Sequence, residues 1–143
     1  MFHTGIYTPV NPSKYNGKYP IYWRSSWEHR VMAMFDTNPS ILEWSSESIK
    51  IPYLNPFTGK HTIYIPDFVV SYIDANNVHK TEIIEVKPVQ ETMLESSKSK
   101  RHKMALALNI HKWAAAQEFA KKYGMSFRVM NENNIFNNPA RNR

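Results

Sequence analysis

Two segments in the middle of the 143-residue chain carry charged side chains where apolar strands are expected. Residues 63–73 and 82–88 are rich in β-branched and aromatic residues, which favours strands, and turn-forming residues separate them. Asp67 interrupts the first run, and Glu85 and Lys87 interrupt the second. Strands disfavour Asp, and a buried charge needs a partner or a metal ion. The sequence therefore predicts a β-hairpin that gathers two carboxylates and one ammonium group.

The second run can be assigned to two faces, because successive side chains of a strand alternate. Ile84 and Val86 share one face. The other face holds Ile83, Glu85 and Lys87. One interpretation is an exposed Glu–Lys pair on a half-solvated sheet, which contributes only about 0–1 kcal/mol. The Pro-Asp pair in the neighbouring run favours the other interpretation, a site that does chemistry.

The arrangement Pro66-Asp67 followed by Glu85-Val86-Lys87 resembles the PD-(D/E)xK nuclease superfamily. The resemblance implies that Asp67, Glu85 and the Val86 backbone carbonyl bind Mg²⁺ or Mn²⁺, since Mg²⁺ prefers hard oxygen ligands. Such an ion lowers the pKa of a bound water and neutralises charge on a scissile phosphate. Lys87 is then expected to orient that water and to face the phosphate.

A helix is predicted upstream of these strands. Ser25 suits its N-cap, Glu28 suits the third helical position of a capping box, and an apolar stripe continues to Phe35. The pair Asn38-Pro39 ends it. Glu28 therefore has a structural interpretation, as a cap worth about 1 kcal/mol.

The other elements follow from periodicity and turn residues. Residues 41–53 predict one or two strands, and a turn at 55–60 leads into the strand from 63, so residues 41–87 are expected to form an antiparallel meander. A helix is predicted from about 104 to 123 and a last strand over 125–130. The fold class is α/β, with a restriction-endonuclease-like αβββαβ core: a mixed sheet flanked by helices.

The chain is long enough for one domain, predicted over residues 23–132. Residues 1–22 are rich in Pro and Tyr, and we expect an extended N-terminal arm that either follows a phosphate backbone or docks on its own domain. Residues 88–103 are expected to form a mobile basic loop, and residues 133–143 a frayed tail.

Charge is distributed unevenly along the chain. Residues 41–95 hold four basic and eight acidic residues, whereas residues 96–143 hold ten and two. An acidic centre beside a basic region suits a metal site next to a DNA-binding surface, and the alternative is ordinary solubility charge. The basic segment predicted to contact DNA comprises Lys98, Lys100, Arg101 and Lys103.

Composition excludes several classes of site. Cysteine is absent and no two of the six histidines have His-x-x-x-His spacing, so disulfides and zinc sites are not expected. The sequence contains no signal-peptide pattern and no apolar run of about 18 residues, so no membrane association is expected.

Further segments resemble the head completion nucleases of contractile-tailed phages, whose core is similar to TnsA-type transposon-end nucleases. The matching segments span about residues 5–132 and are residues 11–17, 24–28, 42–47 and 51–53, with Asn109 and Lys112-Trp113. The segment after Lys87 is less rich in Pro and Lys than that pattern. The resemblance implies that Glu28 joins Asp67 and Glu85 at the metal, that Lys87 is the catalytic lysine, and that Lys112 contacts phosphate.

The resemblance also implies a biological setting. It suggests a Mg²⁺- or Mn²⁺-dependent DNA endonuclease in phage head completion and DNA packaging, with portal or head proteins as partners, in the host cytoplasm during assembly or in the virion. A TnsA-like or resolvase-type recombination nuclease is an alternative. A structural head protein that binds DNA or the portal is another. The sequence indicates neither the oligomeric state nor the DNA specificity.

Overall fold

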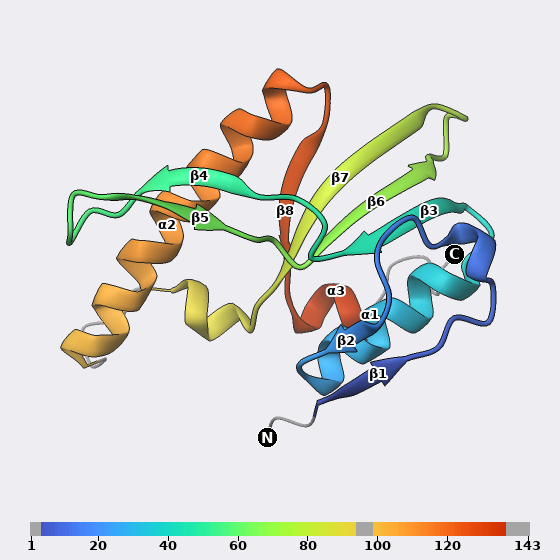
Figure 1. Cartoon of the computed structure of the whole chain (residues 1–143), viewed down its shortest axis with the longest axis horizontal. Helices are drawn as coiled ribbons and strands as arrows, with labels where there is room; N and C mark the ends of the chain where they lie inside the picture. Colours follow the sequence, from blue (N-terminus) through green and yellow to red (C-terminus); the bar gives the residue numbers. More distant parts are fainter. Residues whose placement is uncertain (1–3, 94–98, 137–143) are drawn as a thin grey trace.

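A mixed four-stranded sheet forms the centre of the protein (Figure 1). The structure, a computed structural model, describes residues 4–93 and 99–136. The antiparallel strands β3, β6 and β7 are joined at one edge by β8, which runs parallel to β7. Their bounds are Ile41–Ser46 for β3, Phe68–Ile73 for β6, His79–Val86 for β7 and Ser126–Met130 for β8. The predicted α/β class with a mixed sheet flanked by helices is confirmed.

The two long helices build two separate apolar clusters on β7. Helix α1 (Ser26–Thr37) contributes Val31 to one cluster, and α2 (Lys100–Lys122) contributes Ala116 to the other. The adjacent residues Ile83 and Ile84 are both fully buried, one in each cluster. Because neighbouring strand residues point to opposite faces, β7 is covered on both sides.

The predicted meander is wrong in one respect. Residues 63–73 do not form one strand: β5 (His61–Tyr64) pairs with β4 (Ile51–Leu54) in a separate hairpin, and β6 begins only at Phe68. The buried Pro66 lies in the connection. Proline has no N–H to donate, so it is not accommodated inside a central strand. The β4–β5 hairpin leaves the main sheet and packs against α2 (Figure 1).

The N-terminal segment folds back onto the domain. Strands β1 (Gly5–Tyr7) and β2 (Ile21–Trp23) pair with each other, and a 3-10 turn η1 (Pro12–Lys14) lies between them. The three residues buried against Trp44 and its neighbours are Tyr7, Tyr15 and Ile21. Of the two arrangements expected for the N-terminal arm, the docked one is found for its described residues, 4–22.

Asp36 of α1 holds this segment in place. Its fully buried carboxylate accepts hydrogen bonds from the Tyr7 hydroxyl at 2.6 Å and from the backbone N–H groups of Val10 at 2.7 Å and Asn11 at 2.9 Å. Burial acts to raise the pKa of Asp36, but these hydrogen bonds outweigh it and the pKa is lowered.

The segments expected to be a loop and a tail are partly helical. A short turn η2 (Val89–Thr92) follows β7, and α2 begins at Lys100, four residues before the predicted start. Ser99 caps it by accepting a hydrogen bond from the His102 N–H. A short helix α3 (Glu132–Phe136) buries Ile135 in the cluster on α1. Within the described residues, no helix is sufficiently long and apolar to cross a membrane.

Candidate active site

Asp67 and Glu85 meet where the β6–β7 hairpin ends. The pairing of the two strands stops at Phe68 and Ile84, and beyond it the Asp67 carboxylate accepts a 2.8 Å hydrogen bond from the Val86 backbone N–H. The carbonyl of Asp67 accepts from the Glu47 N–H at 3.0 Å. Asp67 is thus attached to the end of β7, which carries Glu85 and is followed by Lys87, although Asp67 lies in the link before β6 and not inside a strand as predicted.

The two carboxylates repel each other. Burial, followed by the charges of Glu85 and Glu28, raises the pKa of Asp67 well above its usual range. Burial also raises the pKa of Glu85, against the lowering effects of a hydrogen bond from Tyr64 and the charge of Lys87. A bound cation would offset this repulsion between the two carboxylates.

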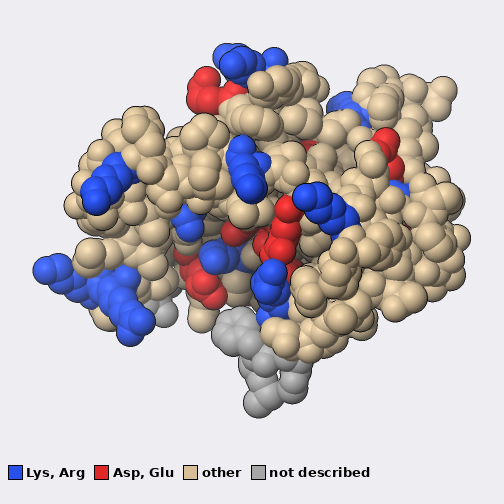
Figure 2. Space-filling view, viewed as in Figure 1, with Lys and Arg blue, Asp and Glu red and all other residues tan. Residues whose placement is uncertain are grey.

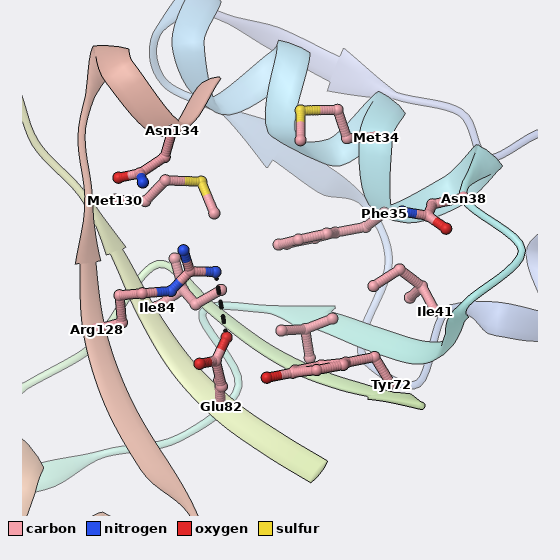
Figure 3. A pocket seen from close by; sticks show the side chains of 11 residues that line it. Met34, Phe35, Asn38, Ile41, Tyr72, Glu82, Ile84, Arg128, Met130 and Asn134 are labelled. Atoms are coloured by element: carbon pink, nitrogen blue, oxygen red, sulfur yellow. Dashed lines mark hydrogen bonds and ion pairs between the residues drawn. The ribbon is translucent and has the colours of Figure 1, made fainter. Parts of the chain in front are cut away.

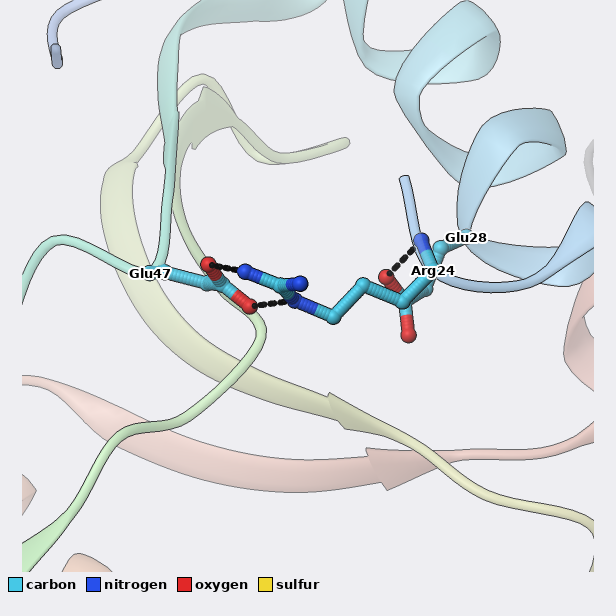
Figure 4. A network of polar contacts seen from close by, with 3 residues as sticks. All are labelled: Arg24, Glu28 and Glu47. Carbon is cyan, nitrogen blue, oxygen red and sulfur yellow. Dashed lines mark hydrogen bonds and ion pairs between the residues drawn. The ribbon is translucent and has the colours of Figure 1, made fainter. Parts of the chain in front are cut away.

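Glu28 takes part in the N-terminal cap of α1, where its carboxylate contacts Arg24 (Figure 4), and it also acts electrostatically on Asp67. Ser25 accepts a hydrogen bond from the Glu28 N–H at 3.2 Å, as expected for an N-cap. The Glu28 carboxylate accepts from the Arg24 backbone N–H at 3.0 Å, one residue before the amide expected in a capping box. Burial, with the charges of Glu47 and Glu85, raises the pKa of Glu28 against the opposing effects of Arg24. Glu28 therefore lies within electrostatic reach of the hairpin carboxylates.

Arg24 connects the start of α1 to the end of β3. Its guanidinium forms a two-point contact with Glu47, with Nε 2.7 Å from one carboxylate oxygen and Nη2 3.0 Å from the other (Figure 4). Glu47 adopts a left-handed backbone conformation with φ of 50°. Arg24 and Glu47, which are 23 residues apart in the sequence, are thereby brought to one rim of the site.

Lys87 and Glu28 line a shared cavity of about 430 Å³. Val86 and Arg24 also line it, together with Glu91, whose carboxylate oxygen is 3.9 Å from the Lys87 Nζ. The backbone N–H of Lys87 donates to the Met130 carbonyl at 2.9 Å, which fixes the position of Lys87 next to β8. The structure thus places Glu28, Val86 and Lys87 around one space. Asp67 and Glu85 do not line it, but both are within electrostatic reach of Lys87.

The donor set fits a hard divalent cation that keeps part of its hydration. Among the described residues, no three His, Cys, Asp or Glu side chains form a cluster that could hold a metal ion by themselves. Asp67 and Glu85 instead form a pair of mutually repelling carboxylates, whose oxygens are of the type that hard cations prefer. Mg²⁺ is commonly bound by one or two carboxylates and several waters, so this pair fits it.

The basic residues predicted to contact DNA lie in two places. Lys112 of α2 stands over the β4–β5 hairpin, its Nζ 5.9 Å from the Tyr53 ring centroid and 5.8 Å from that of Tyr64, and its charge acts on Glu85. Lys100, Arg101 and Lys103 are exposed in the first turn of α2, and Lys98 lies outside the described residues. Figure 2 shows basic side chains gathered at the end of the molecule where α2 begins, and acidic ones near the centre.

Tyr64 is a residue of this site that the sequence did not indicate. Its hydroxyl donates a 2.7 Å hydrogen bond to the Glu85 carboxylate, while its side chain is buried between the hairpin and α2. The sequence held one indication of it: a tyrosine three residues before Asp67. In the structure this tyrosine is the buried last residue of β5.

A second cavity, of about 500 Å³, lies between α1, the main sheet and α3 (Figure 3). Its floor is apolar, with Phe35 and Ile84, and an ion pair of 3.2 Å between Arg128 and Glu82 lines it. None of the predicted site residues lines this cavity.

The chain is similar to known nucleases over almost its whole length. Residues 38–132 match the family model described as TnsA-like endonuclease N terminal. The head completion nuclease of Enterobacteria phage T4 is 33% identical over an alignment of 146 residues. The alignment covers 94% of this chain and 95% of that protein. The predicted resemblance is therefore confirmed. The chain belongs to the TnsA-like endonuclease family, with a PD-(D/E)xK arrangement at Pro66-Asp67 and Glu85-Val86-Lys87.

Proposed function

We propose that this protein is a metal-dependent DNA endonuclease that acts during phage head completion and DNA packaging. The observation that carries the proposal is the repelling carboxylate pair Asp67 and Glu85, held together at a hairpin end with Lys87 beside it. Buried groups with strongly perturbed pKa values are typical of catalytic sites. The setting is suggested by the T4 relative, which is named a head completion nuclease.

Each residue has a role that suits its place. Asp67 and Glu85 would hold Mg²⁺ or Mn²⁺ together with the Val86 carbonyl. Glu28, which forms no three-carboxylate cluster with them in the described residues, would join the metal site through a water of the ion. The bound ion would acidify a water and offset charge on the phosphate. Lys87, whose ammonium group lies at the wall of the cavity shared with Glu28, would hydrogen bond to the phosphate and orient the attacking water.

DNA would be held by basic groups of α2 and of the segment before it. Lys112 is close enough to act on Glu85, so it is suited to a phosphate near the cleaved bond. Lys100, Arg101 and Lys103, together with Lys98, would add contacts that do not depend on base sequence. Portal or head proteins would be the protein partners, in the host cytoplasm during assembly or in the virion.

One alternative has an observation in its favour. The family model that matches residues 38–132 is named for TnsA-like endonucleases, so a recombination nuclease that works with a recombinase partner is a second candidate function. The chemistry at the hairpin would be the same in both cases, and the DNA substrate would differ.

A cleavage assay tests the proposal. Supercoiled, linear and branched DNA are incubated with the protein in Mg²⁺, in Mn²⁺ and in EDTA, beside Asp67→Asn and Lys87→Ala. We expect cleavage with either metal, none in EDTA, and none by the two variants. DNA binding without cleavage in any metal would instead favour a structural DNA-binding head protein, and equal cleavage by Asp67→Asn would show that the site is misassigned.

A further inference from the structure

Tyr64 and Asp67 lie on one short segment, and both reach the strand that carries Glu85. Asp67 does so through the Val86 N–H, and Tyr64 through its hydroxyl, which is 2.7 Å from Oε1 of Glu85. The Tyr64 side chain is only 4% exposed, packed in the apolar cluster that contains Ile83. A donor on a buried ring cannot swing away, so it restricts the Glu85 side chain to one arrangement.

We propose that Tyr64 is a positioning residue, which orients the Glu85 carboxylate for a divalent cation. The inference rests on the proposed function and adds a residue to it. A carboxylate has about four lone-pair sites, and the Tyr64 hydroxyl and the Asp67 backbone N–H together use about two of them, so Glu85 keeps acceptor sites for a metal ion. Hydrogen-bonded partners of this kind orient the groups that ligate metals and tune their affinity.

Tyr53 provides a matched comparison within the same hairpin. It is buried in the same cluster, and its ring is 5.9 Å from the Lys112 Nζ, against 5.8 Å for Tyr64. Among the described residues, the side chain that donates a hydrogen bond to Glu85 is that of Tyr64, beside a backbone hydrogen bond from Asp67, and none comes from Tyr53. The two tyrosines thus share their packing and their cationic neighbour, and they differ in the contact on which the proposal depends.

The experiment compares Tyr64→Phe with Tyr53→Phe in the full chain. Mn²⁺ binding is measured by titration calorimetry and by the Mn²⁺-induced rise in melting temperature, and the Mg²⁺ dependence of plasmid cleavage is recorded in parallel. Tyr64→Phe should weaken Mn²⁺ binding by about 10–100-fold, the range typical for loss of such a partner. It should shift the Mg²⁺ requirement for cleavage in the same direction, while Tyr53→Phe should resemble the parent protein.

A double-variant cycle shows whether the effect passes through Glu85. In a Glu85→Gln background, Tyr64→Phe should have little further effect on Mn²⁺ binding, because coupled residues are not additive. Equal Mn²⁺ affinity of Tyr64→Phe and Tyr53→Phe, in a parent that binds and cleaves, would overturn this inference alone. A Tyr64→Phe protein that fails to fold would also overturn it, since the hydroxyl would then serve the fold. A parent protein that neither binds Mn²⁺ nor cleaves DNA would overturn the proposed function itself.

Discussion

The Asp67 carboxylate accepts a 2.8 Å hydrogen bond from the backbone N–H of Val86, the residue between Glu85 and Lys87. This contact joins the link before β6 to the end of β7 by a bond that requires no metal ion. It also holds the Asp67 carboxylate near that of Glu85, and the repulsion between the two lowers the stability of the metal-free protein. Several expected outcomes depend on this arrangement.

Replacing Asp67 with Asn should abolish cleavage and stabilise the metal-free protein at neutral pH. The amide oxygen can still accept from the Val86 N–H, while the charge that repels Glu85 is gone. Because the pKa of Asp67 is raised in the folded state, its contribution to stability is present below its unfolded pKa of about 3.9 and is lost as pH rises through the folded pKa. Melting curves in EDTA at increasing pH should therefore show a widening advantage for the variant.

Asp74→Asn is the matched control for that series. Asp74 lies in the β6–β7 turn, and its pKa is lowered, chiefly by a hydrogen bond from the Val78 N–H. The pKa shift of Asp74 is opposite in sign to that of Asp67, so Asp74→Asn should reduce stability at neutral pH and have less effect in acid. An advantage of Asp67→Asn that is the same at every pH would contradict the repulsion argument.

Glu28→Gln should separate the capping role of Glu28 from its chemical role. The amide oxygen can still accept from the Arg24 N–H, so the start of α1 is retained. We expect the metal-free melting temperature to stay unchanged or rise, because a half-buried carboxylate within electrostatic reach of Glu85 is neutralised. Cleavage should fall by at least about 10²-fold, the low end for a positioned catalytic group.

Ser25→Ala gives the stability change expected for loss of the cap alone. It removes the acceptor for the Glu28 N–H and should cost about 1 kcal/mol in a denaturant titration. If Glu28→Gln lost as much stability as Ser25→Ala and cleaved DNA at the parent rate, Glu28 would be a structural residue and the hairpin alone would build the site.

The basic first turn of α2 should affect stability and DNA binding in opposite directions. Lys100, Arg101 and Lys103 lie at the helix N-terminus with no acidic residue in the first turn, where a positive charge is unfavourable by about 0.3–1 kcal/mol. Changing all three to Gln should stabilise the protein and weaken DNA binding. The slope of log affinity against log salt should decrease by about 0.9 for each lost contact with duplex phosphate.

The other end of α2 provides the control for this charge effect. Lys121 and Lys122 lie in the last turn, where positive charge suits the helix dipole. Changing both to Gln should destabilise the protein and leave the salt slope as it was. An unchanged salt slope in the Lys100, Arg101 and Lys103 variant would assign these residues to an ordinary solvated surface.

Asp36 should control how the N-terminal segment responds to acid. Its pKa is lowered in the folded state, so its contribution to stability is present above the unfolded pKa of about 3.9 and is lost as pH falls through the folded pKa. Asp36→Ala leaves the Tyr7 hydroxyl and the Val10 and Asn11 N–H groups without this acceptor, at a cost of about 1–3 kcal/mol. Denaturant titrations at pH 7 and at pH 3 should show this loss mainly at pH 7.

Glu43→Ala is a control for the same segment. Glu43 is exposed on β3 and accepts a 2.6 Å hydrogen bond from the Asn16 side chain, so it also holds the N-terminal segment, but at the surface. Its loss should cost less than the loss of Asp36. A larger effect from Glu43 would show that the buried carboxylate is not the main attachment.

Local sequence rules predicted α1, most of α2 and the β6–β7 hairpin, but not the short helix α3. Ser25 and the Asn38-Pro39 pair mark the observed start and end of α1, because caps and proline act on neighbouring residues. Pro66 signalled the break between β5 and β6, but the continuous apolar run around it predicted a single strand. Whether such a run stays in one sheet depends on what packs against it, here α2, which lies far along the chain.

Tyr64 and Asp36 show why the remaining features were harder to predict. Both owe their importance to partners 21 and 29 residues away, Glu85 and Tyr7, and neither belongs to a short motif. A periodicity argument places Tyr64 on a buried face and Asp36 near a helix end, but it does not indicate which donor or acceptor each will meet. The roles of Glu28, Asp67, Glu85 and Lys87 remain predictions, which the variants above will test.

The position of β7 inside the sheet has a consequence for the motions of the site. This strand pairs with β6 on one side and β8 on the other, and Ile83 and Ile84 bury it on both faces. Its amide protons should exchange with solvent only when the whole domain unfolds, whereas the outer edges of β3 and β8 can open locally. Glu85 should therefore lie on the most slowly exchanging of the described strands, whereas Asp67 lies in a link and Glu28 in the first turn of a helix, where local opening is expected to be easier.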